Sequence, residues 1–137
     1  MSGTKFEWPD LRGLMDDFSE YFEEIGQSLQ IANEDDLEAG FDRARNALNY
    51  IPDADAAHMA ALIFDGVVTR HPLIDGNKRL AWQGMTTFLD LNSIWFDASE
   101  LEAAEIALAV VAGKAEAEDL AQFIRENTSV WSPEDPA

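Results

Sequence analysis

Residues 70–79 read RHPLIDGNKR and predict how two helices of the chain are joined. Pro72 disfavours the α conformation for the residue before it, so we expect His71 at or just beyond the end of a helix. Gly76 permits backbone geometry that other residues resist, and the next helix is predicted to begin there. Three of the nine basic residues of the chain lie in this stretch: Arg70, Lys78 and Arg79. Because the chain also holds 27 acidic residues, this concentration of positive charge indicates a site for an anionic ligand.

The sequence on both sides of this stretch has the apolar spacing of helices. Apolar residues recur every three or four positions, whereas the alternating apolar and polar runs that are typical of strands are scarce. Six helices are predicted, over about residues 11–32, 34–48, 53–70, 76–91, 100–112 and 116–126. We therefore expect an all-α fold, formed by a single compact helical domain.

Residues that begin and end helices support these boundaries. Asn33 is a suitable N-cap and is followed by three acidic residues, which favour the positive end of a helix dipole. Pro52 ends the second helix. Ser99 and Glu102 form a capping box at the start of the fifth helix, and Gly113 supplies its stop.

The length and composition are those of one domain. No linker, internal repeat or low-complexity tract divides the 137 residues. We expect a single domain over residues 1–137, in which residues 128–137 form a loose tail. The chain contains no cysteine, which excludes a disulfide framework and agrees with a reducing compartment.

The net charge of −18 bears on partners and location. Binding to nucleic acid depends on neutralising phosphates with Lys and Arg, so this charge argues against DNA and RNA as ligands. No apolar run approaches the length of about 18 residues that a membrane span needs, and the N-terminus lacks the features of a signal peptide. We expect a cytoplasmic protein that binds neither nucleic acid nor membrane.

The start of the fourth predicted helix has the parts of a phosphate-binding site. The first N–H groups of a helix have no intrahelical acceptor, so those of Asn77, Lys78 and Arg79 are available to an anion. The positive end of the helix and two cationic side chains lie at the same place. Together these groups predict a cradle for phosphate.

Two further residues indicate a reaction at this cradle. An imidazole can take a proton from an attacking hydroxyl at neutral pH, which makes His71 a candidate general base. Asp75 would face the same cleft and could hold Mg²⁺, which prefers carboxylate and phosphate oxygens. The parts therefore predict phosphoryl or nucleotidyl transfer.

Simpler explanations of the same residues stay open. His71 could only cap the preceding helix, and the two cations could only pair with carboxylates. The sequence has neither a P-loop nor the Gly-x-Gly pair of a dinucleotide-binding fold. His58 lies mid-helix among alanines and is predicted to be structural. Trp82, one turn after Arg79, could line either the cleft or the core.

The segment HPLIDGNKR, residues 71–79, resembles the signature of the Fic/Doc family, His-x-Phe-x-(Asp/Glu)-(Gly/Ala)-Asn-(Gly/Lys)-Arg. Similar segments follow it, FLDLNSIWF and ALAVVAGKAEAEDLAQFI, so the resemblance covers residues 53–126. Within the family the chain looks closer to the Doc (death-on-curing) toxins than to the larger Fic proteins. Lys78 replaces the second glycine of the Fic motif, and Trp82 stands where Fic enzymes have a second arginine. Leu73 replaces the phenylalanine of the signature.

This resemblance implies an activity and a set of roles. Doc proteins transfer the γ-phosphate of ATP to a threonine of elongation factor Tu, whereas Fic enzymes transfer AMP to a target hydroxyl. His71 would be the general base, and Asp75 would orient Mg²⁺ or the substrate. The remaining motif residues would bind the phosphates of ATP: Gly76 and Asn77 as an anion hole, Lys78 and Arg79 as neutralising cations.

The resemblance also implies partners, and it leaves alternatives open. A Doc-like toxin of a toxin–antitoxin module would modify a protein such as elongation factor Tu and would be silenced by a separate antitoxin. The alternatives are a Fic-type AMP or nucleotidyl transferase and a non-catalytic binding module of the same fold. Residues 45–52 are predicted to supply the flap that lies across the target segment in this family.

Overall fold

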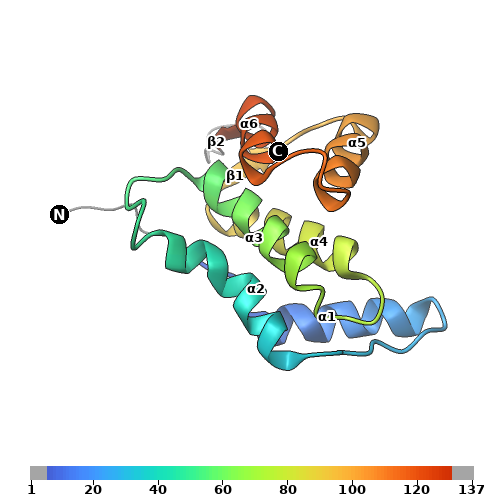
Figure 1. Cartoon of the computed structure of the whole chain (residues 1–137). Helices are drawn as coiled ribbons and strands as arrows, with labels where there is room; N and C mark the ends of the chain where they lie inside the picture. Colours follow the sequence, from blue (N-terminus) through green and yellow to red (C-terminus); the bar gives the residue numbers. More distant parts are fainter. Residues whose placement is uncertain (1–5, 131–137) are drawn as a thin grey trace.

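Six helices and one small sheet make up residues 6–130, the part of the chain that this computed structural model describes (Figure 1). The helices are α1 (Leu11–Glu24), α2 (Glu34–Ala47), α3 (Ala56–Arg70), α4 (Asn77–Leu91), α5 (Glu100–Val111) and α6 (Ala117–Glu126). Strand β1 (Ile94–Phe96) pairs antiparallel with β2 (Thr128–Val130). The predicted all-α fold with six helices is confirmed. None of the helices described here combines the length and the apolar character that crossing a membrane requires.

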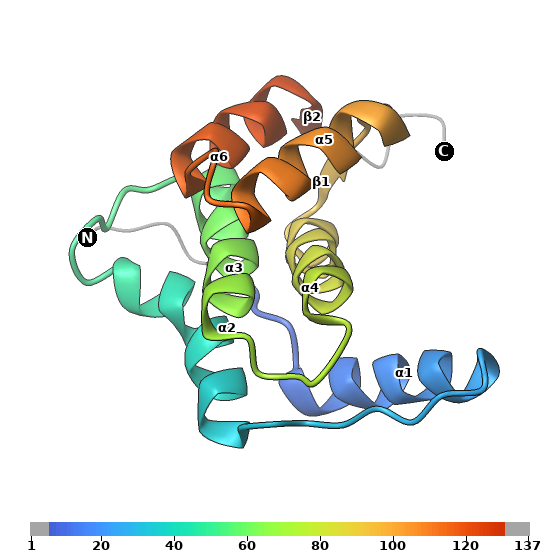
Figure 2. The same cartoon turned by 45° about the vertical axis from the view of Figure 1, so that its right-hand side comes forward.

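Helix α3 lies at the centre because most of its residues are apolar. Nine of its residues are buried: Ala57, Met59, Ala60, Ala61, Leu62, Ile63, Phe64, Gly66 and Val67. A helix with so wide an apolar surface is stable only inside a core, and α3 packs against α2, α4 and α6. Figure 2 shows α2 and α4 on either side of α3, with α1 across the end from which the chain passes to α4.

Two glycines set the close approach of α2 and α3. A Cβ atom on Gly66 would overlap the carbonyl oxygen of Gly40, and a Cβ on Gly40 would lie 3.1 Å from the carbonyl oxygen of Gly66. The two backbones therefore touch directly, which holds the C-terminal half of α3 firmly in place. The residue that follows α3 is His71.

The predicted N-caps are confirmed. Asn33 Oδ1 accepts from the N–H of Asp36 at 3.0 Å, and Ser99 Oγ accepts from the N–H of Glu102 at 3.1 Å. Helix α3 begins within a few residues of its predicted start, and its N-cap is Asp55, whose Oδ1 accepts from the third following N–H at 3.0 Å. Gly113, the predicted stop of α5, has φ 76°.

The predicted extent of the first helix is wrong, because α1 ends at Glu24 and not near residue 32. Gly26 adopts φ 79°, and its N–H donates to the carbonyl of Glu23 at 3.0 Å. The N–H of Gln27 donates to the carbonyl of Phe22 at 2.8 Å. This pair of bonds is a Schellman motif, which ends a helix although the apolar spacing continues.

The sheet is a second difference from the sequence-based expectation. The segment between the fourth and fifth predicted helices contains β1, and residues 128–130, predicted as part of a loose tail, form β2. Trp95 lies opposite Ser129 in this pairing. The rest of the predicted tail, residues 131–137, lies outside the described residues. Strands of three residues are too short to show an alternating pattern.

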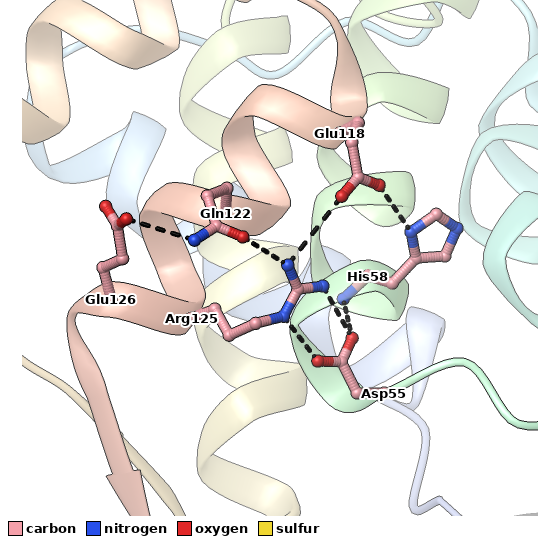
Figure 3. A network of polar contacts seen from close by, with 6 residues as sticks. All are labelled: Asp55, His58, Glu118, Gln122, Arg125 and Glu126. Carbon is pink, nitrogen blue, oxygen red and sulfur yellow. Dashed lines mark hydrogen bonds and ion pairs between the residues drawn. The ribbon is translucent and has the colours of Figure 1, made fainter.

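A polar network joins the start of α3 to α6 (Figure 3). The Arg125 guanidinium donates to both carboxylate oxygens of Asp55, at 2.7 and 3.0 Å, and lies 3.8 Å from Glu118. These hydrogen bonds hold the pKa of Asp55 below its usual value, and the carboxylate raises the pKa of Arg125. His58 is not mid-helix as expected: it lies in the first turn of α3, with Nδ1 3.4 Å from Glu118.

Candidate active site

A cavity of about 460 Å³ opens beside the loop between α3 and α4. All six residues predicted for the site line it: His71, Asp75, Gly76, Asn77, Lys78 and Arg79. The opposite wall comes from α1 and the turn after it, with Tyr21, Phe22, Ile25 and Gln27. The predicted residues therefore share one space, and it has a volume typical of small-molecule pockets, roughly 300–1,000 Å³.

His71 leaves the helix in a left-handed conformation. Its N–H still donates to the carbonyl of Val67 at 2.9 Å, but its φ and ψ are 51° and 56°. As predicted, the residue before Pro72 avoids the right-handed α region, although residues before proline more often adopt the extended region. A left-handed conformation costs a residue with a Cβ about 1–2 kcal/mol. This geometry puts the exposed His71 side chain at the cavity.

Asn77 locks the loop from within. It is only 7% exposed, its Oδ1 accepts from the N–H of Leu73 at 2.8 Å, and its Nδ2 donates to the Leu73 carbonyl at 2.9 Å. The oxygen and the nitrogen of the carboxamide are thus both engaged in hydrogen bonds within the loop. Of the groups of Asn77 proposed for an anion hole, only the backbone N–H remains available to a ligand.

The other side of the loop is held by the chain segment that follows α1. Ile31 and Leu73 form an antiparallel bridge, and the N–H of Ile74 donates to the Gln30 carbonyl at 3.0 Å. The N–H of Ala32 donates to the carbonyl of Pro72 at 2.7 Å. Leu73 itself is 1% exposed, so it fills the core in place of the phenylalanine of the signature.

The segment beside the motif loop is therefore residues 27–33, and the prediction that residues 45–52 supply a flap here is wrong. Asn46, Ala47 and Tyr50 line a different cavity, which lies along α2 and α3. The extended conformation after the Schellman turn brings residues 27–33 to the loop. The apolar spacing of this segment, which resembles that of a helix, concealed it in the sequence.

Gly76 is required both by its backbone and by its surroundings. Its φ is 94°, and a Cβ atom would lie 2.8 Å from Cζ of Phe22. Phe22 is buried on α1 and forms the floor beneath the loop. Sequence reasoning missed this role of α1. Its only local signal was the group of three aromatic residues at helical spacing, Phe18, Tyr21 and Phe22.

The first turn of α4 presents open hydrogen-bond donors. The first helical bond runs from the N–H of Leu80 to the carbonyl of Gly76 at 2.9 Å, and Gly76 has no side chain to cap the helix. The N–H groups of Asn77, Lys78 and Arg79 donate to no acceptor within residues 6–130. Such groups at the positive end of a helix favour an anion, above all a phosphate.

Only two of the three cations in residues 70–79 lie at this cavity. Arg70 Nη1 is 3.2 Å from Asp36 Oδ1 on α2, and Arg70 lines the cavity along α2 and α3. Lys78 and Arg79 line the cavity with His71. The guanidinium carbon of Arg79 lies 4.9 Å from the centre of the Tyr21 ring.

The donor set fits Mg²⁺ only in company with a phosphate ligand. Among the described residues, no three His, Asp or Glu side chains are grouped as a metal site. Within residues 6–130, Asp75 alone supplies a carboxylate to the cavity. One or two carboxylates together with substrate phosphates are the usual protein ligands of Mg²⁺, so this set agrees with a nucleotide-bound ion.

Trp82 lies outside this cavity. Its ring packs edge-on against Phe64 at 6.0 Å and lies 5.8 Å from Phe96. It lines a separate groove between α4 and α5, which also contains Lys78 and Arg79. The sequence left open whether Trp82 lines the cleft or the core. It packs on core aromatic rings and contributes to a neighbouring groove.

The chain is thus a helical domain in which an uncapped helix start, two cations and a histidine face one small-molecule cavity. A sequence profile described as Fic/DOC family matches residues 10–89, more than half of the chain, and the chain belongs to this family. The match includes α1, which the resemblance over residues 53–126 left out. The search of curated proteins found no match. Membership supports a Fic-type protein-modifying transferase in general, in a family that generally uses ATP with Mg²⁺ and acts on proteins.

Proposed function

We propose that the chain is a Doc-like toxin that transfers the γ-phosphate of ATP to a hydroxyl of a protein such as elongation factor Tu and so inhibits translation. The observation that carries this proposal is the shared cavity of His71 and the uncapped start of α4. A separate antitoxin would restrain the toxin. Because the proposed target is a translation factor, we place this activity in the cytoplasm.

In the proposed reaction His71 acts as the general base. One nitrogen of its ring takes the proton from the target hydroxyl while the hydroxyl oxygen forms a bond to the γ-phosphorus. The bond between the γ-phosphorus and the bridging oxygen breaks, and ADP leaves with that oxygen. The left-handed backbone of His71 supports this role, because it turns the side chain away from the axis of α3 toward the cavity.

The start of α4 would stabilise the charge of the transferred group. The open N–H groups of Asn77, Lys78 and Arg79 would bind the phosphoryl oxygens, and the two cationic side chains would neutralise the phosphate chain. Asp75 would hold Mg²⁺, which supplies further neutralisation of phosphate charge when it is bound with ATP.

The choice of γ-phosphate transfer over AMP transfer rests on the cations available. Lys78 and Arg79 line the cavity, while Trp82, at the position of the second arginine of Fic enzymes, packs on Phe64 and Phe96. In AMP transfer the β- and γ-phosphates of the nucleotide form the leaving group, and cations must hold them. A site with fewer cations therefore favours transfer of the terminal phosphate. Nucleotidyl transfer is the second candidate, and a non-catalytic binding module is the third.

A labelling experiment separates the three candidates. Elongation factor Tu is incubated with Mg²⁺ and ATP labelled at either the α or the γ position, with wild type or His71→Ala, and its intact mass is measured. Label from the γ position alone, absent with His71→Ala, supports the kinase. Label from the α position selects nucleotidyl transfer, and ATP binding without any label on this or other candidate targets selects a binding module.

A further inference from the structure

The guanidinium of Arg79 stacks on an aromatic ring, whereas most arginines in the described part of the chain pair with carboxylates. Its guanidinium carbon lies 4.9 Å from the centre of the Tyr21 ring, and both side chains line the His71 cavity. No carboxylate lies within 4 Å of its guanidinium nitrogens in residues 6–130. By contrast, four other arginines pair with Asp side chains: Arg43, Arg45, Arg70 and Arg125.

The difference has an electrostatic consequence in a chain of net charge −18. A carboxylate partner would fix the guanidinium in place but would cancel its charge. The face of an aromatic ring attracts a cation through its quadrupole and carries no net charge. Arg79 can therefore be held at the cavity while it keeps its full attraction for an anion.

Tyr21 is itself held firmly. Its ring stacks on Phe18 at 6.2 Å and packs edge-on against Phe22 at 6.1 Å. Phe22 in turn lies directly beneath Gly76, at the start of α4. The aromatic cluster of α1, which consists of Phe18, Tyr21 and Phe22, thus connects the loop backbone and the Arg79 side chain in one rigid arrangement.

We infer that Tyr21 is a positioning residue that holds the Arg79 guanidinium at the cavity without neutralising it, ready for the phosphates of a nucleotide. The nucleotide in this inference rests on the proposed function. The stacking of Tyr21 and Arg79 does not, so the two can be tested apart.

The test compares Tyr21→Leu, which removes the π face, with Tyr21→Phe, which keeps the π face and loses only the hydroxyl. Tyr50→Leu is the matched control, because Tyr50 is 85% exposed and lines the cavity along α2 and α3. Arg79→Lys is a fourth variant. It keeps the charge of an exposed side chain but lacks the planar group that stacks on the ring. This variant therefore tests the stacking even if Tyr21→Leu fails to fold.

The first readout is the ¹⁵N–¹H NMR signal of Arg79 Nε in the free protein, assigned by its loss in Arg79→Lys. The expected result is a ring-shifted, ordered signal in wild type, Tyr21→Phe and Tyr50→Leu, and a free-arginine signal in Tyr21→Leu. The same signal in Tyr21→Leu as in wild type would overturn the inference.

The second readout is the Kd of Mg·ATP from calorimetry. The expected result is about 2- to 30-fold weaker binding for Tyr21→Leu and Arg79→Lys, with Tyr21→Phe and Tyr50→Leu within twofold of wild type. Equal losses in Tyr21→Phe and Tyr21→Leu would overturn the inference, because the hydroxyl and not the ring would then matter. An ordered Arg79 signal in a wild type that binds no Mg·ATP would uphold the stacking and refute the proposed function instead.

Discussion

Asn77 closes two hydrogen bonds on the backbone of Leu73, accepting from its N–H at 2.8 Å and donating to its carbonyl at 2.9 Å. The pair spans the loop that carries Asp75 and Gly76, and it ties the first residue of α4 to the core, in which Leu73 is buried. The loop is thereby shaped before any ligand arrives. Hydrogen-bond donors that are already in place stabilise a developing charge better than donors that must first reorganise.

Replacing Asn77 should therefore cost both stability and activity. Asn77→Ala leaves the N–H and carbonyl of Leu73 without their partner, and we expect the free energy of unfolding to fall by about 1–3 kcal/mol. Urea unfolding measures this change. Asn46→Ala on the exposed side of α2 is the control and should stay within about 0.5 kcal/mol of wild type. Equal values for the two variants would show that the bonds to Leu73 contribute nothing.

Gly76 should tolerate alanine worse than Gly113, another glycine with positive φ. Gly113 also has positive φ, 76°, but a Cβ there would meet nothing within 4 Å, whereas at Gly76 it would meet Phe22. Gly113→Ala should cost about 1–2 kcal/mol from backbone strain alone. Gly76→Ala should cost about 1–3 kcal/mol more, because the ring must move.

A double-mutant cycle tests the reason for that difference. Phe22→Leu should remove part of the extra cost of Gly76→Ala, because it removes the ring atoms that a Cβ would meet. The four unfolding free energies are measured in urea. Strict additivity of the two substitutions would contradict a contact between Phe22 and a side chain at position 76.

Two cations of residues 70–79, Arg70 and Lys78, should differ in their effect on nucleotide binding. Arg70 pairs with Asp36 and lines another cavity, so Arg70→Gln should leave the Kd of Mg·ATP within about twofold. Lys78 lines the His71 cavity, and Lys78→Gln should weaken binding about tenfold or more, as expected for one charge-assisted bond to phosphate. Calorimetry measures both. A larger loss in Arg70→Gln than in Lys78→Gln would place the anion elsewhere.

The ion pair of Asp55 and Arg125 should stabilise the fold at neutral pH and lose its effect in acid. Hydrogen bonds from Arg125 hold the pKa of Asp55 in the folded chain below its ordinary 3.8. A lowered folded-state pKa contributes stability above the unfolded value, and this contribution is lost as the pH falls through the folded value. Both side chains are partly exposed, so we expect about 0.5–1 kcal/mol at neutral pH.

The comparison for this prediction is Asp55→Asn, which keeps a side chain able to cap α3. Urea unfolding of both forms between pH 3 and 7 should give a constant advantage of wild type from about pH 5 upward and a shrinking one below about pH 4. An advantage that grows as the pH falls would contradict the lowered pKa of Asp55.

Local signals in the sequence were sufficient for most helix boundaries. Asn33 and Ser99 cap their helices through bonds to residues three positions away, and such bonds can be read from neighbouring letters. Helix α1 ends at a Schellman turn formed at Gly26. The sequence-based prediction missed this end because the apolar spacing of a helix continues beyond it. The strands β1 and β2 depend on pairing between residues more than thirty positions apart, which no local pattern carries.

The residues of the site also fall into two groups, those that local sequence signals predicted and those that depend on tertiary packing. Six of the cavity residues lie close together within the motif. The prediction grouped them because the start of a helix binds anions. Tyr21 and Phe22 reach the cavity only through the packing of α1, and the pairing of Arg70 with Asp36 spans 34 positions. Of the three cations in residues 70–79, the two assigned to the cradle, Lys78 and Arg79, line the cavity.

The central claim is that His71 and the start of α4 together transfer a phosphate. Its most direct test is the transfer of label from γ-labelled ATP to elongation factor Tu, compared between wild type and His71→Ala at equal ATP occupancy. We expect labelled target with wild type and a rate at least about 100-fold lower with His71→Ala, because a general base typically contributes about 10²–10⁴ in rate. Equal rates of labelling with the two forms would contradict it.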